Sequence, residues 1–347
     1  MLPFWLMFLL PVWAIVAPRR LPSRQQAWAW WMAGVLLAVT IGLRHEVGAD
    51  WFNYLEHFRL ASRLRLDEVF DRSDPGHYFL NWLTARLGGN VYWVNLAYAS
   101  VLAWGTVTFC RRQPWPWLAL VVAVPYMLIV VGMGYSRQAV ALGFSLVGLV
   151  ALGEKRVRVF VACVALGALF HKSAVLLLPI AMLANSRNRF VTASMVAAIS
   201  ALLYYLLLSE DVDALWNQYV RADMESQGAK IRVLMNTVPA ALMLLYGNRL
   251  TSSPQERRLW TIIALLALLC LPLVTVASTA VDRVALYLIP LQLYVFSRLP
   301  RLAGDNVRLR TGLVLGVIGY YAAVQFVWLN FATHARHWVP YQFGPLA

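Results

Sequence analysis

Charged side chains are scarce in this sequence of 347 residues. Only 13% of the residues are Asp, Glu, Lys or Arg, whereas a soluble domain usually carries about 25%. Hydrophobic residues make up 61%, and they form long uninterrupted runs such as 191–208 and 259–277. Runs of this length match the roughly 20 residues that a helix needs to cross a bilayer core. The shortage of charge therefore excludes an ordinary soluble domain and indicates an integral membrane protein.

The apolar runs also lack the alternation of polar and apolar residues that marks a membrane β-barrel. A spanning chain must satisfy its backbone hydrogen bonds internally, which leaves helices as the spanning structure. We therefore predict an all-α polytopic membrane protein, a single integral membrane domain over residues 1–347 with about twelve transmembrane helices, some of them short or re-entrant. The predicted spans are 2–17, 26–43, 91–109, 117–135, 138–152, 157–170, 173–184, 190–208, 231–247, 259–277, 284–298 and 311–331.

Motifs of soluble enzymes are missing as well. The sequence has no phosphate-binding loop, dinucleotide fingerprint or metalloprotease motif. Its three cysteines, Cys110, Cys163 and Cys270, do not have the spacing of metal ligands. We therefore expect neither a metal nor a cofactor. The apolar segment Met1–Ala17 lacks the basic region of a signal peptide and is predicted to be the first span.

The charges that are present divide between two sets of loops. If alternate loops face the cytoplasm, beginning with Arg19–Arg24, these loops hold 17 Lys and Arg against three acidic residues. The other loops hold 13 basic residues, 13 acidic residues and all six histidines. Cytoplasmic loops of membrane proteins are enriched in Lys and Arg. The division predicts a bacterial inner-membrane protein with both termini outside, and it explains the net charge of +14 without nucleic acid as a partner.

The same charge division bears on the segment Val157–Ala184. A single helix over this segment would be about 42 Å long, well beyond the bilayer core. It would also move every later loop to the opposite side of the membrane, so that the basic cluster Arg298–Arg310 would lie outside. We therefore predict two short helices that meet at His171–Lys172, below the outer membrane surface.

Two outer segments are longer than simple turns, at about 44–90 and 209–230. Aromatic residues recur at helical spacing in Trp51–Phe58, which predicts an amphipathic helix on the membrane surface. Asp74–Gly76 predicts a turn. The following stretch, His77–Leu87, is too short to span and is expected to form a re-entrant or interfacial helix.

Polar and charged residues gather at the outer ends of the predicted helices. Taken singly, each could be the snorkelling end of a helix, a local ion pair or a hydrogen-bonded core histidine. As a set they share one aqueous side, where several cations suit an anionic ligand, because arginine pairs with phosphate oxygens bidentately. A lipid-linked diphosphate lies at this depth. The clusters are Arg44/His45/Asp50, Ser136-Arg137-Gln138, His171-Lys172-Ser173, Arg221 with Lys230/Arg232, and Asp282-Arg283.

These clusters also contain proton acceptors and aromatic neighbours. Asp50, Asp282 or His171 could serve as general base for an attacking hydroxyl. The aromatic residues either stack on sugars or belong to the interfacial belt of a membrane protein. They are Trp51, Tyr54, Trp216, Tyr219, Trp338 and Tyr341.

Five short motifs are spread over nearly the whole chain: Gly42–Tyr54, Ser136–Ala141, Phe170–Ala174, Asp282–Tyr287 and Trp338–Tyr341. In this order they resemble the EpsG family of Wzy-type polysaccharide polymerases. Each motif is short, and the order of all five carries the resemblance. Lys172 and Asp282 are departures from the family's pattern.

The resemblance implies an enzyme that joins oligosaccharide repeat units carried on undecaprenyl diphosphate into an exopolysaccharide or O-antigen at the periplasmic face. The growing chain on its lipid diphosphate would be the donor, and a hydroxyl of the incoming unit the acceptor. A metal-independent glycosyltransferase with a GT-C-like architecture is the implied class. Implied partners are the lipid-linked oligosaccharide, membrane lipids, a chain-length regulator and a flippase.

For this implied reaction four residues are expected to be catalytic. Arg137 and Arg283 would hold the donor diphosphate and offset the charge that builds on the leaving phosphate. His171 or Asp50 would take the proton of the acceptor hydroxyl. The other candidates are expected to bind or orient the substrate: Arg44, Gln138, Lys172, Ser173, Arg232, Asp282, Tyr287, Trp51, Tyr54, Trp338 and Tyr341.

Three other functions compete with this one. An O-antigen ligase would use the same basic site and would yield capped lipid A instead of a polymer ladder. A transporter, such as a flippase of lipid-linked sugars, should place polar groups along a path through the membrane, whereas the predicted spans 259–277 and 311–331 contain no charge. A non-catalytic scaffold would have no use for the outer charges.

Overall fold

Helices make up almost all of the folded chain. The computed structural model describes residues 1–17, 22–180, 194, 197–198 and 228–344. The strands in these residues are two short ones, β1 (Arg44–His45) and β2 (Gln342–Phe343), which pair antiparallel. The chain is an all-α membrane protein, as predicted.

Several sequence predictions fall outside the described residues. They concern most of the span 190–208, most of the outer segment 209–230, and Trp216, Tyr219 and Arg221.

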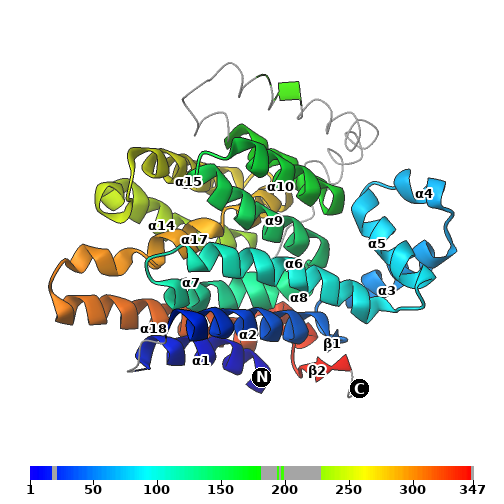
Figure 1. The fold of residues 1–347 in the computed structure, drawn as a ribbon, viewed down its shortest axis with the longest axis horizontal. Helices are drawn as coiled ribbons and strands as arrows, with labels where there is room; N and C mark the ends of the chain where they lie inside the picture. The colour runs from blue at the N-terminus through cyan, green and yellow to red at the C-terminus, as the bar shows by residue number, and fades with distance from the viewer. Residues whose placement is uncertain (18–21, 181–193, 195–196, 199–227, 345–347) are drawn as a thin grey trace.

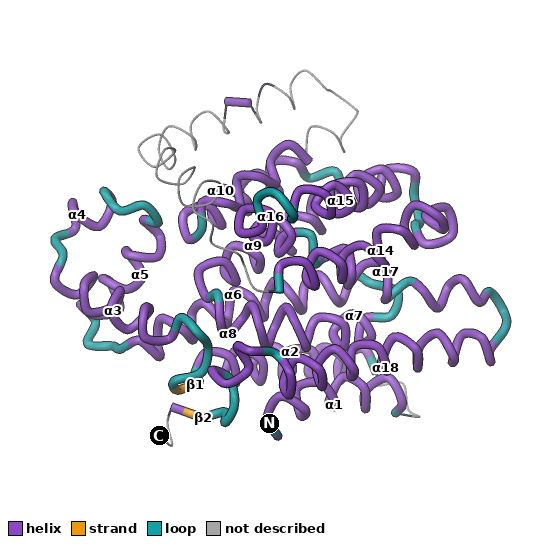
Figure 2. Tube along the Cα trace, turned by 180° about the vertical axis from the view of Figure 1, so that it is seen from behind, coloured by secondary structure: helices purple, strands orange, loops and turns teal. Residues whose placement is uncertain are grey.

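The long helices form a bundle, and the short helices α3, α4 and α5 lie together at one end of it (Figures 1 and 2). A π-helical stretch, η1 (Val124–Val131), joins α7 to α8. Short 3-10 helices are η2 (Lys172–Leu177), η4 (Leu299–Ala303) and η5 (Thr333–His337). The α-helices are α1 (Leu2–Val16), α2 (Ser23–Gly42), α3 (Trp51–Arg63), α4 (Leu66–Phe70), α5 (Pro75–Arg86), α6 (Val91–Arg111), α7 (Pro116–Ala123), α8 (Gly132–Gly134), α9 (Ser136–Gly153), α10 (Val157–Phe170), α14 (Ala229–Leu250), α15 (Pro254–Leu273), α16 (Ser278–Tyr287), α17 (Pro290–Phe296) and α18 (Val307–Phe331).

In the described part of the chain, five helices are long and apolar enough to cross a membrane. They are α6, the continuous helix Pro116–Gly134, α9, α14 and α18. The pair α16 and α17, bent by 47°, would make a sixth crossing. The figure of about twelve crossings and the GT-C-like architecture stay predictions.

The helix α10 ends where the sequence predicted a junction. It has 14 residues and stops at Phe170, and η2 begins at Lys172. A helix of 14 residues is about 21 Å long, shorter than the bilayer core of about 30 Å. His171 is therefore set at the end of a helix too short to reach from one membrane surface to the other.

Small residues allow α6 and α9 to approach closely in the middle of the bundle. A Cβ on Gly105 of α6 would lie 2.1 Å from the backbone oxygen of Gly143 on α9. A Cβ on Gly143 would in turn lie 2.7 Å from the backbone oxygen of Val101. Close backbone contact through glycine is typical of helix pairs in membranes, where association depends on tight packing. This contact fixes the position of α9, whose first turn carries Arg137.

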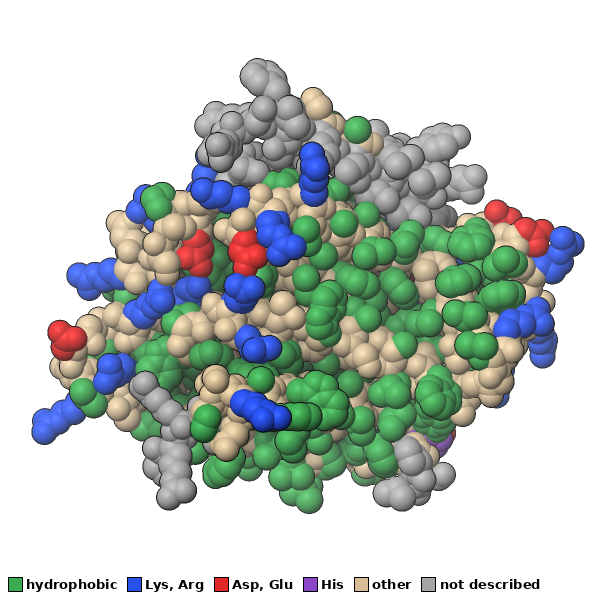
Figure 3. Space-filling view, in the orientation of Figure 1, with side chains coloured by type: hydrophobic (Ala, Val, Ile, Leu, Met, Phe, Trp, Pro, Cys, Tyr) green, Lys and Arg blue, Asp and Glu red, His purple; other side chains and the backbone are tan. Residues whose placement is uncertain are grey.

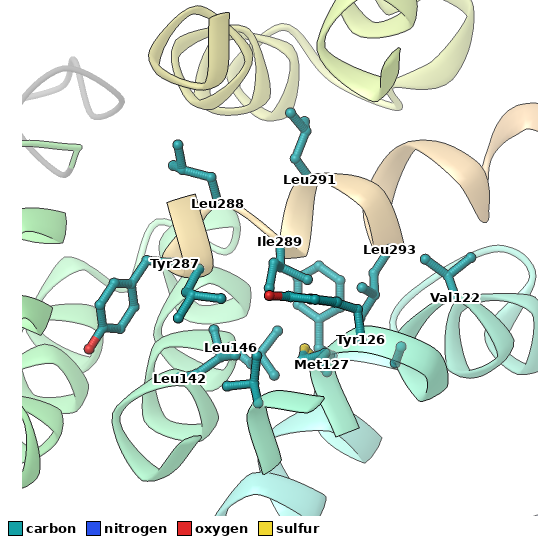
Figure 4. Packing of buried hydrophobic residues seen from close by; sticks show 14 of the residues in the cluster. Val122, Tyr126, Met127, Leu142, Leu146, Tyr287, Leu288, Ile289, Leu291 and Leu293 are labelled. Carbon is teal, nitrogen blue, oxygen red and sulfur yellow. The ribbon is translucent and has the colours of Figure 1, made fainter. Parts of the chain in front are cut away.

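The break between α16 and α17 coincides with Pro290. Proline has no backbone N–H to donate, so Pro290 cannot continue the hydrogen bonding of α16, although Ile289 before it keeps helical dihedrals. Figure 4 shows the apolar side chains around this break packed on residues of η1 and α9, with the Tyr287 ring at the edge of the cluster. The break therefore ends α16 so that its polar first turns lie beside the first turn of α9.

Charged residues concentrate at the two ends of the bundle. Figure 3 shows a largely hydrophobic surface between a group at the left that is mostly Lys and Arg with some Asp and Glu, and a mixed charged group at the right. We call the right end, with α3, α4, α5, β1 and β2, the α5 end. We call the left end, where α15 begins and η4 lies, the Arg298 end. This distribution is that of a bundle crossing a membrane.

The outer segment 44–90 folds into short helices, and Trp51 and Tyr54 face the protein whereas Phe52 and Phe70 are exposed. The predicted helix is α3, but Trp51 and Tyr54 are 4% and 5% exposed, so these rings do not lie on a membrane surface. The stretch after the predicted turn forms α5, which begins at Pro75, a position where proline is favoured. The segment is thus a cap of short helices over the α5 end.

Candidate functional site

Arg44 anchors the loop between α2 and α3. The side chain is 1% exposed, and it donates to the backbone oxygens of Ile41 at 2.7 Å and Val47 at 2.9 Å. A third bond of 2.8 Å reaches the hydroxyl of Ser136, the first residue of α9. Because a buried charge needs such partners, Arg44 is held by the protein and positions the start of α9.

The C-terminal segment holds the same loop from the other side. β2 pairs with β1, and the Gly48 N–H donates to the backbone oxygen of His337 at 2.8 Å. Gly48 has a φ of +104°, and a Cβ there would lie 2.1 Å from the backbone oxygen of Met133. Only glycine fits this position. The first sequence motif is therefore in contact with the residues on both sides of the last one.

Arg137, the second residue of α9, forms an ion pair with Asp74 at the start of α5. Its Nη1 lies 2.6 Å from Asp74 Oδ2, and the two side chains are 31% and 7% exposed. The backbone N–H of Arg137 donates to the Tyr54 hydroxyl at 3.3 Å. Within the described residues, the other guanidinium nitrogens of Arg137 make no hydrogen bond. They remain able to bind an anionic ligand.

Asp74 is a site residue that sequence reasoning treated only as part of a turn. Burial raises the pKa of this carboxyl, while the charges of Arg137 and Lys172 lower it. Its partner Arg137 is 63 residues away along the chain. The only hint in the sequence was the position of this acidic residue just before Pro75-Gly76. That position does not indicate which residue pairs with Asp74.

His171 is the centre of a hydrogen-bonded chain that joins η2 to α16. Arg283 Nη1 lies 3.1 Å from His171 Nε2, and the Ser173 hydroxyl lies 2.7 Å from His171 Nδ1. Arginine can only donate, so His171 Nε2 accepts. Nδ1 faces Ser173, whose backbone N–H donates to it at 3.4 Å. The Ser173 hydroxyl also lies 3.3 Å from the Tyr287 hydroxyl.

The predicted residues of the third and fourth motifs are thus brought together. His171 lies in the link between α10 and η2, and burial lowers its pKa to about 3, with the charges of Arg283, Arg137 and Lys172 adding to the shift. The ring is therefore neutral at pH 7, and its acceptor nitrogen is occupied by Arg283.

Asp50 precedes the first turn of α3 and is partly exposed. Burial raises the pKa of its carboxyl, and the charges of Arg137 and Arg283 oppose that shift. The Asn53 side chain donates to Oδ1 at 3.4 Å. Asp50 therefore lies within the electrostatic reach of both predicted catalytic arginines.

Two contacts fix α16 against its neighbours. Gln138 of α9 donates through Nε2 to the backbone oxygen of Arg283 at 3.0 Å. Arg232 of α14 makes a bidentate ion pair with Asp282, and both side chains are largely buried, at 13% and 10% exposure. These three residues join α9, α14 and α16 around Arg283.

Of the predicted aromatic residues, Trp51, Tyr54 and Trp338 lie inside the protein. The Trp51 ring packs against His45, Tyr92 and the Arg44 guanidinium. Trp338 is 2% exposed and donates through Nε1 to the backbone oxygen of Ile129 at 3.0 Å.

Tyr341 is likewise held by a hydrogen bond from its side chain to a backbone oxygen. Its hydroxyl donates to the backbone oxygen of Thr40 at 2.7 Å. Tyr54, as described above, accepts the N–H of Arg137. These aromatic side chains hold the loop, the C-terminal segment and the start of α9 in place.

Another polar chain was not identified from the sequence. His57 Nδ1 lies 3.1 Å from His77 Nε2, and His77 Nδ1 lies 2.6 Å from the Tyr98 hydroxyl. Burial lowers the pKa of both histidines, and the charge of Arg137 lowers it further. Arg137 therefore acts electrostatically on this chain as well as on His171.

The order and convergence of the five motifs agree with one comparison. A model of the EpsG family matches residues 27–343, nearly the whole chain. The chain belongs to the EpsG family. This is a family of Wzy-like polysaccharide polymerases, and a function of the polysaccharide-polymerase type follows from membership. No curated protein and no solved structure matches the chain.

The residues matched by the EpsG model include every element of the polar cluster at the α5 end. In the described part of the protein, no three His, Cys, Asp or Glu side chains come together as a metal site. What the cluster presents is a set of arginines with a partly exposed carboxylate. Such a set can bind an anion and accept a proton.

Proposed function

We propose that this EpsG-family protein is a glycosyltransferase that polymerises oligosaccharide units carried on undecaprenyl diphosphate, at the periplasmic face of the bacterial inner membrane. The observation that carries the proposal is the convergence of Arg137 and Arg283 at the α5 end. Both charges act on Asp50 and on His171. The α5 end is assigned to the periplasm because the predicted outer loops carry no net charge and the other loops are strongly basic.

Two cations and one carboxylate suffice for the transfer step. The acceptor hydroxyl oxygen forms a bond to the anomeric carbon of the growing glycan, and the bond from that carbon to the diphosphate oxygen breaks. The electron pair of the broken bond leaves with undecaprenyl diphosphate, which gains one negative charge. Arg137 and Arg283 offset this charge, which is transition-state stabilisation by preorganised donors. The hydroxyl proton passes to the base.

Asp50 suits the role of base better than His171. The His171 acceptor nitrogen is occupied by Arg283 Nη1 at 3.1 Å, and a ring of such low pKa is a weak base. The Asp50 carboxyl is partly exposed, and its raised pKa makes it a stronger base than an ordinary carboxylate. In this proposal His171, Ser173 and Tyr287 orient the Arg283 guanidinium.

The remaining predicted residues support this core. Lys172 adds positive charge next to Asp74. Gln138 and the pair of Arg232 with Asp282 fix α16. The buried Arg44, Trp51 and Trp338 and the partly buried Tyr341 hold the surrounding chain, and the proposal assigns them no sugar contact.

Incubation of the purified protein with undecaprenyl diphosphate carrying the host's repeat unit tests the proposal. The expected product is a ladder of polymer lengths. Asp50→Asn should reduce the rate about 100- to 10,000-fold, the range of a general base. Glu46→Gln, which changes an exposed carboxylate in the same loop, should leave the rate unchanged.

Other products would identify the competing functions. A single transfer to lipid A would indicate a ligase. Movement of the lipid-linked unit across a vesicle bilayer without any new bond would indicate a flippase. Either result, in place of a ladder, would overturn the proposal.

A further inference from the structure

The chain of His57, His77 and Tyr98 has no part in the transfer step described above. It joins three elements, because His57 is on α3, His77 on α5 and Tyr98 on α6. His77 and Tyr98 are 0% and 3% exposed, whereas His57 is partly exposed. The chain therefore runs from the interior of the bundle to a partly exposed ring beside Arg137.

The hydrogen bonds determine where each ring proton lies. The Asn81 amide nitrogen donates to the backbone oxygen of His77 at 2.7 Å, and the same nitrogen lies 3.4 Å from His77 Nδ1. An amide nitrogen can only donate, so His77 Nδ1 is an acceptor. The Tyr98 O–H donates to it at 2.6 Å.

The proton of His77 is consequently on Nε2. It is donated to His57 Nδ1 at 3.1 Å. A neutral His57 that accepts at Nδ1 must carry its own proton on Nε2. His57 is thus fixed as a hydrogen-bond donor through Nε2–H.

The surroundings of His57 suit an uncharged polar ligand. Burial lowers the pKa of His57 and of His77, and the nearby charge of Arg137 lowers both further, so both rings are neutral at pH 7. The partly exposed ring of Tyr78 lies 5.8 Å from the His57 ring. A neutral N–H beside an aromatic ring matches sugar hydroxyls and C–H faces. The diphosphate of the same lipid-linked unit is matched by Arg137 and Arg283, so His57 is left for the sugar.

We propose that His57 contacts the glycan of the lipid-linked unit, its Nε2–H donating to a sugar hydroxyl next to the diphosphate held by Arg137. This inference rests on the proposed function and deepens it. His77 and Tyr98 are positioning residues, because they act on the sugar only by fixing the proton of His57.

Binding of two lipids to the full-length protein in nanodiscs tests the glycan contact. One probe is undecaprenyl diphosphate carrying the host's repeat unit, and the other is undecaprenyl diphosphate without sugar. His57→Leu should weaken binding of the glycosylated lipid about five- to tenfold, the size of one hydrogen bond between neutral groups. It should not change binding of the sugarless lipid. His57→Gln, which keeps an N–H donor at a similar reach, should stay within about twofold of the wild type.

The outcomes separate this inference from the proposed function. Equal losses for the two lipids in His57→Leu, or no loss for either, would overturn the glycan contact. Sugar-dependent binding with no polymer formed would support the contact and refute the polymerase.

The positioning role has its own measurement. In Tyr98→Phe the closer of the two donors to His77 Nδ1 is removed and only the 3.4 Å contact with Asn81 is left, so the ring protons of His57 should distribute more evenly over both nitrogens. The histidine 15N NMR spectrum should then show mixed tautomers, and affinity for the glycosylated lipid should fall about two- to threefold. An unchanged 15N spectrum of His57 would overturn the positioning role.

Discussion

Two arginine–carboxylate pairs, one at each end of the bundle, differ in how far they are enclosed. At the Arg298 end, Arg298 lies 2.7 Å from Glu256, with side chains 5% and 20% exposed. Its guanidinium also donates to Gln113 and lies 3.6 Å from the centre of the Tyr294 ring. At the α5 end the Arg137 side chain is 31% exposed, and its bond to Asp74 uses one guanidinium nitrogen.

The comparison shows that the exposure of the arginine determines whether such an ion pair stabilises the fold or can bind a ligand. Arg298 connects the α17 side to α15 and to the link between α6 and α7, because its two terminal nitrogens bind protein groups. Its Nε is buried and makes no hydrogen bond within the described residues. Arg137 is fixed on one side only and keeps donors for a ligand. An arginine–carboxylate pair therefore stabilises the fold at the Arg298 end and supplies a candidate ligand-binding group at the α5 end.

The largest effect should come from removing Arg137. In Arg137→Ala the leaving diphosphate loses a preorganised cation, so the polymerisation rate should fall at least about 100-fold. The ladder assay on purified protein measures the rate, and the yield of folded protein from membranes serves as control. Arg283→Ala should behave in the same way. Full chain lengths from either variant would remove that arginine from the mechanism.

Removal of Arg298 should instead affect stability. In Arg298→Ala the largely buried Glu256 carboxylate loses its partner, which typically costs about 3–5 kcal/mol. Thermal unfolding in detergent should show a lower midpoint, while activity per folded molecule is retained. Arg308→Ala, an exposed position on α18, is the matched control. An unchanged unfolding midpoint for Arg298→Ala would contradict the stabilising role of Arg298.

Acid should destabilise the α5 end through His77. Its folded-state pKa is well below the ordinary value of 6.5 because of burial and the charge of Arg137. Below pH 6.5 the unfolded chain binds a proton that the folded chain does not, so stability is complete above this pH and falls below it. The loss is at most about 1.4 kcal/mol per pH unit for one histidine.

Unfolding midpoints at pH 7.5 and 5.5 measure this effect. The wild type should lose more stability over this range than His77→Gln, whose side chain does not titrate. The same dependence in the two proteins would show that His77 takes no part in it.

The smallest effect should come from Ser173→Ala. This change removes the hydroxyl between His171 and Tyr287, so Arg283 is held less firmly. The loss of a hydrogen bond between neutral groups is about 1 kcal/mol, or roughly fivefold in the polymerisation rate. Ser62→Ala, on the exposed side of α3, provides the comparison. A loss as large as that of Arg137→Ala would give Ser173 a direct part in the chemistry.

Local sequence features predicted several elements well. Uninterrupted apolar runs predicted the helices α6, α9 and α18, because helix formation in a membrane depends on length and composition. The end of α10 at Phe170 was placed correctly from helix length and loop charge. The helix α3 was also expected, but its aromatic face was assigned to the membrane instead of to the protein.

The partners of the site residues were not predictable in this way. Asp74 is 63 residues from Arg137, and Tyr98 is 21 residues from His77. Hydrophobic periodicity shows which side of one helix is apolar, and it carries no information on which polar groups of separate helices will meet. The five motifs indicated that polar residues share one end of the bundle, without showing that Arg232 pairs with Asp282.

The sequence by itself determined the membrane class, the polar residues of the α5 end and the family, because these depend on composition and on the order of short motifs. The tertiary structure alone decided that Arg44 is enclosed, that Arg137 keeps donors for a ligand, and that His57 is joined to Tyr98 through His77. Enclosure and hydrogen-bond partners are set by the packing of helices far apart in the chain. No local stretch of residues encodes that packing separately.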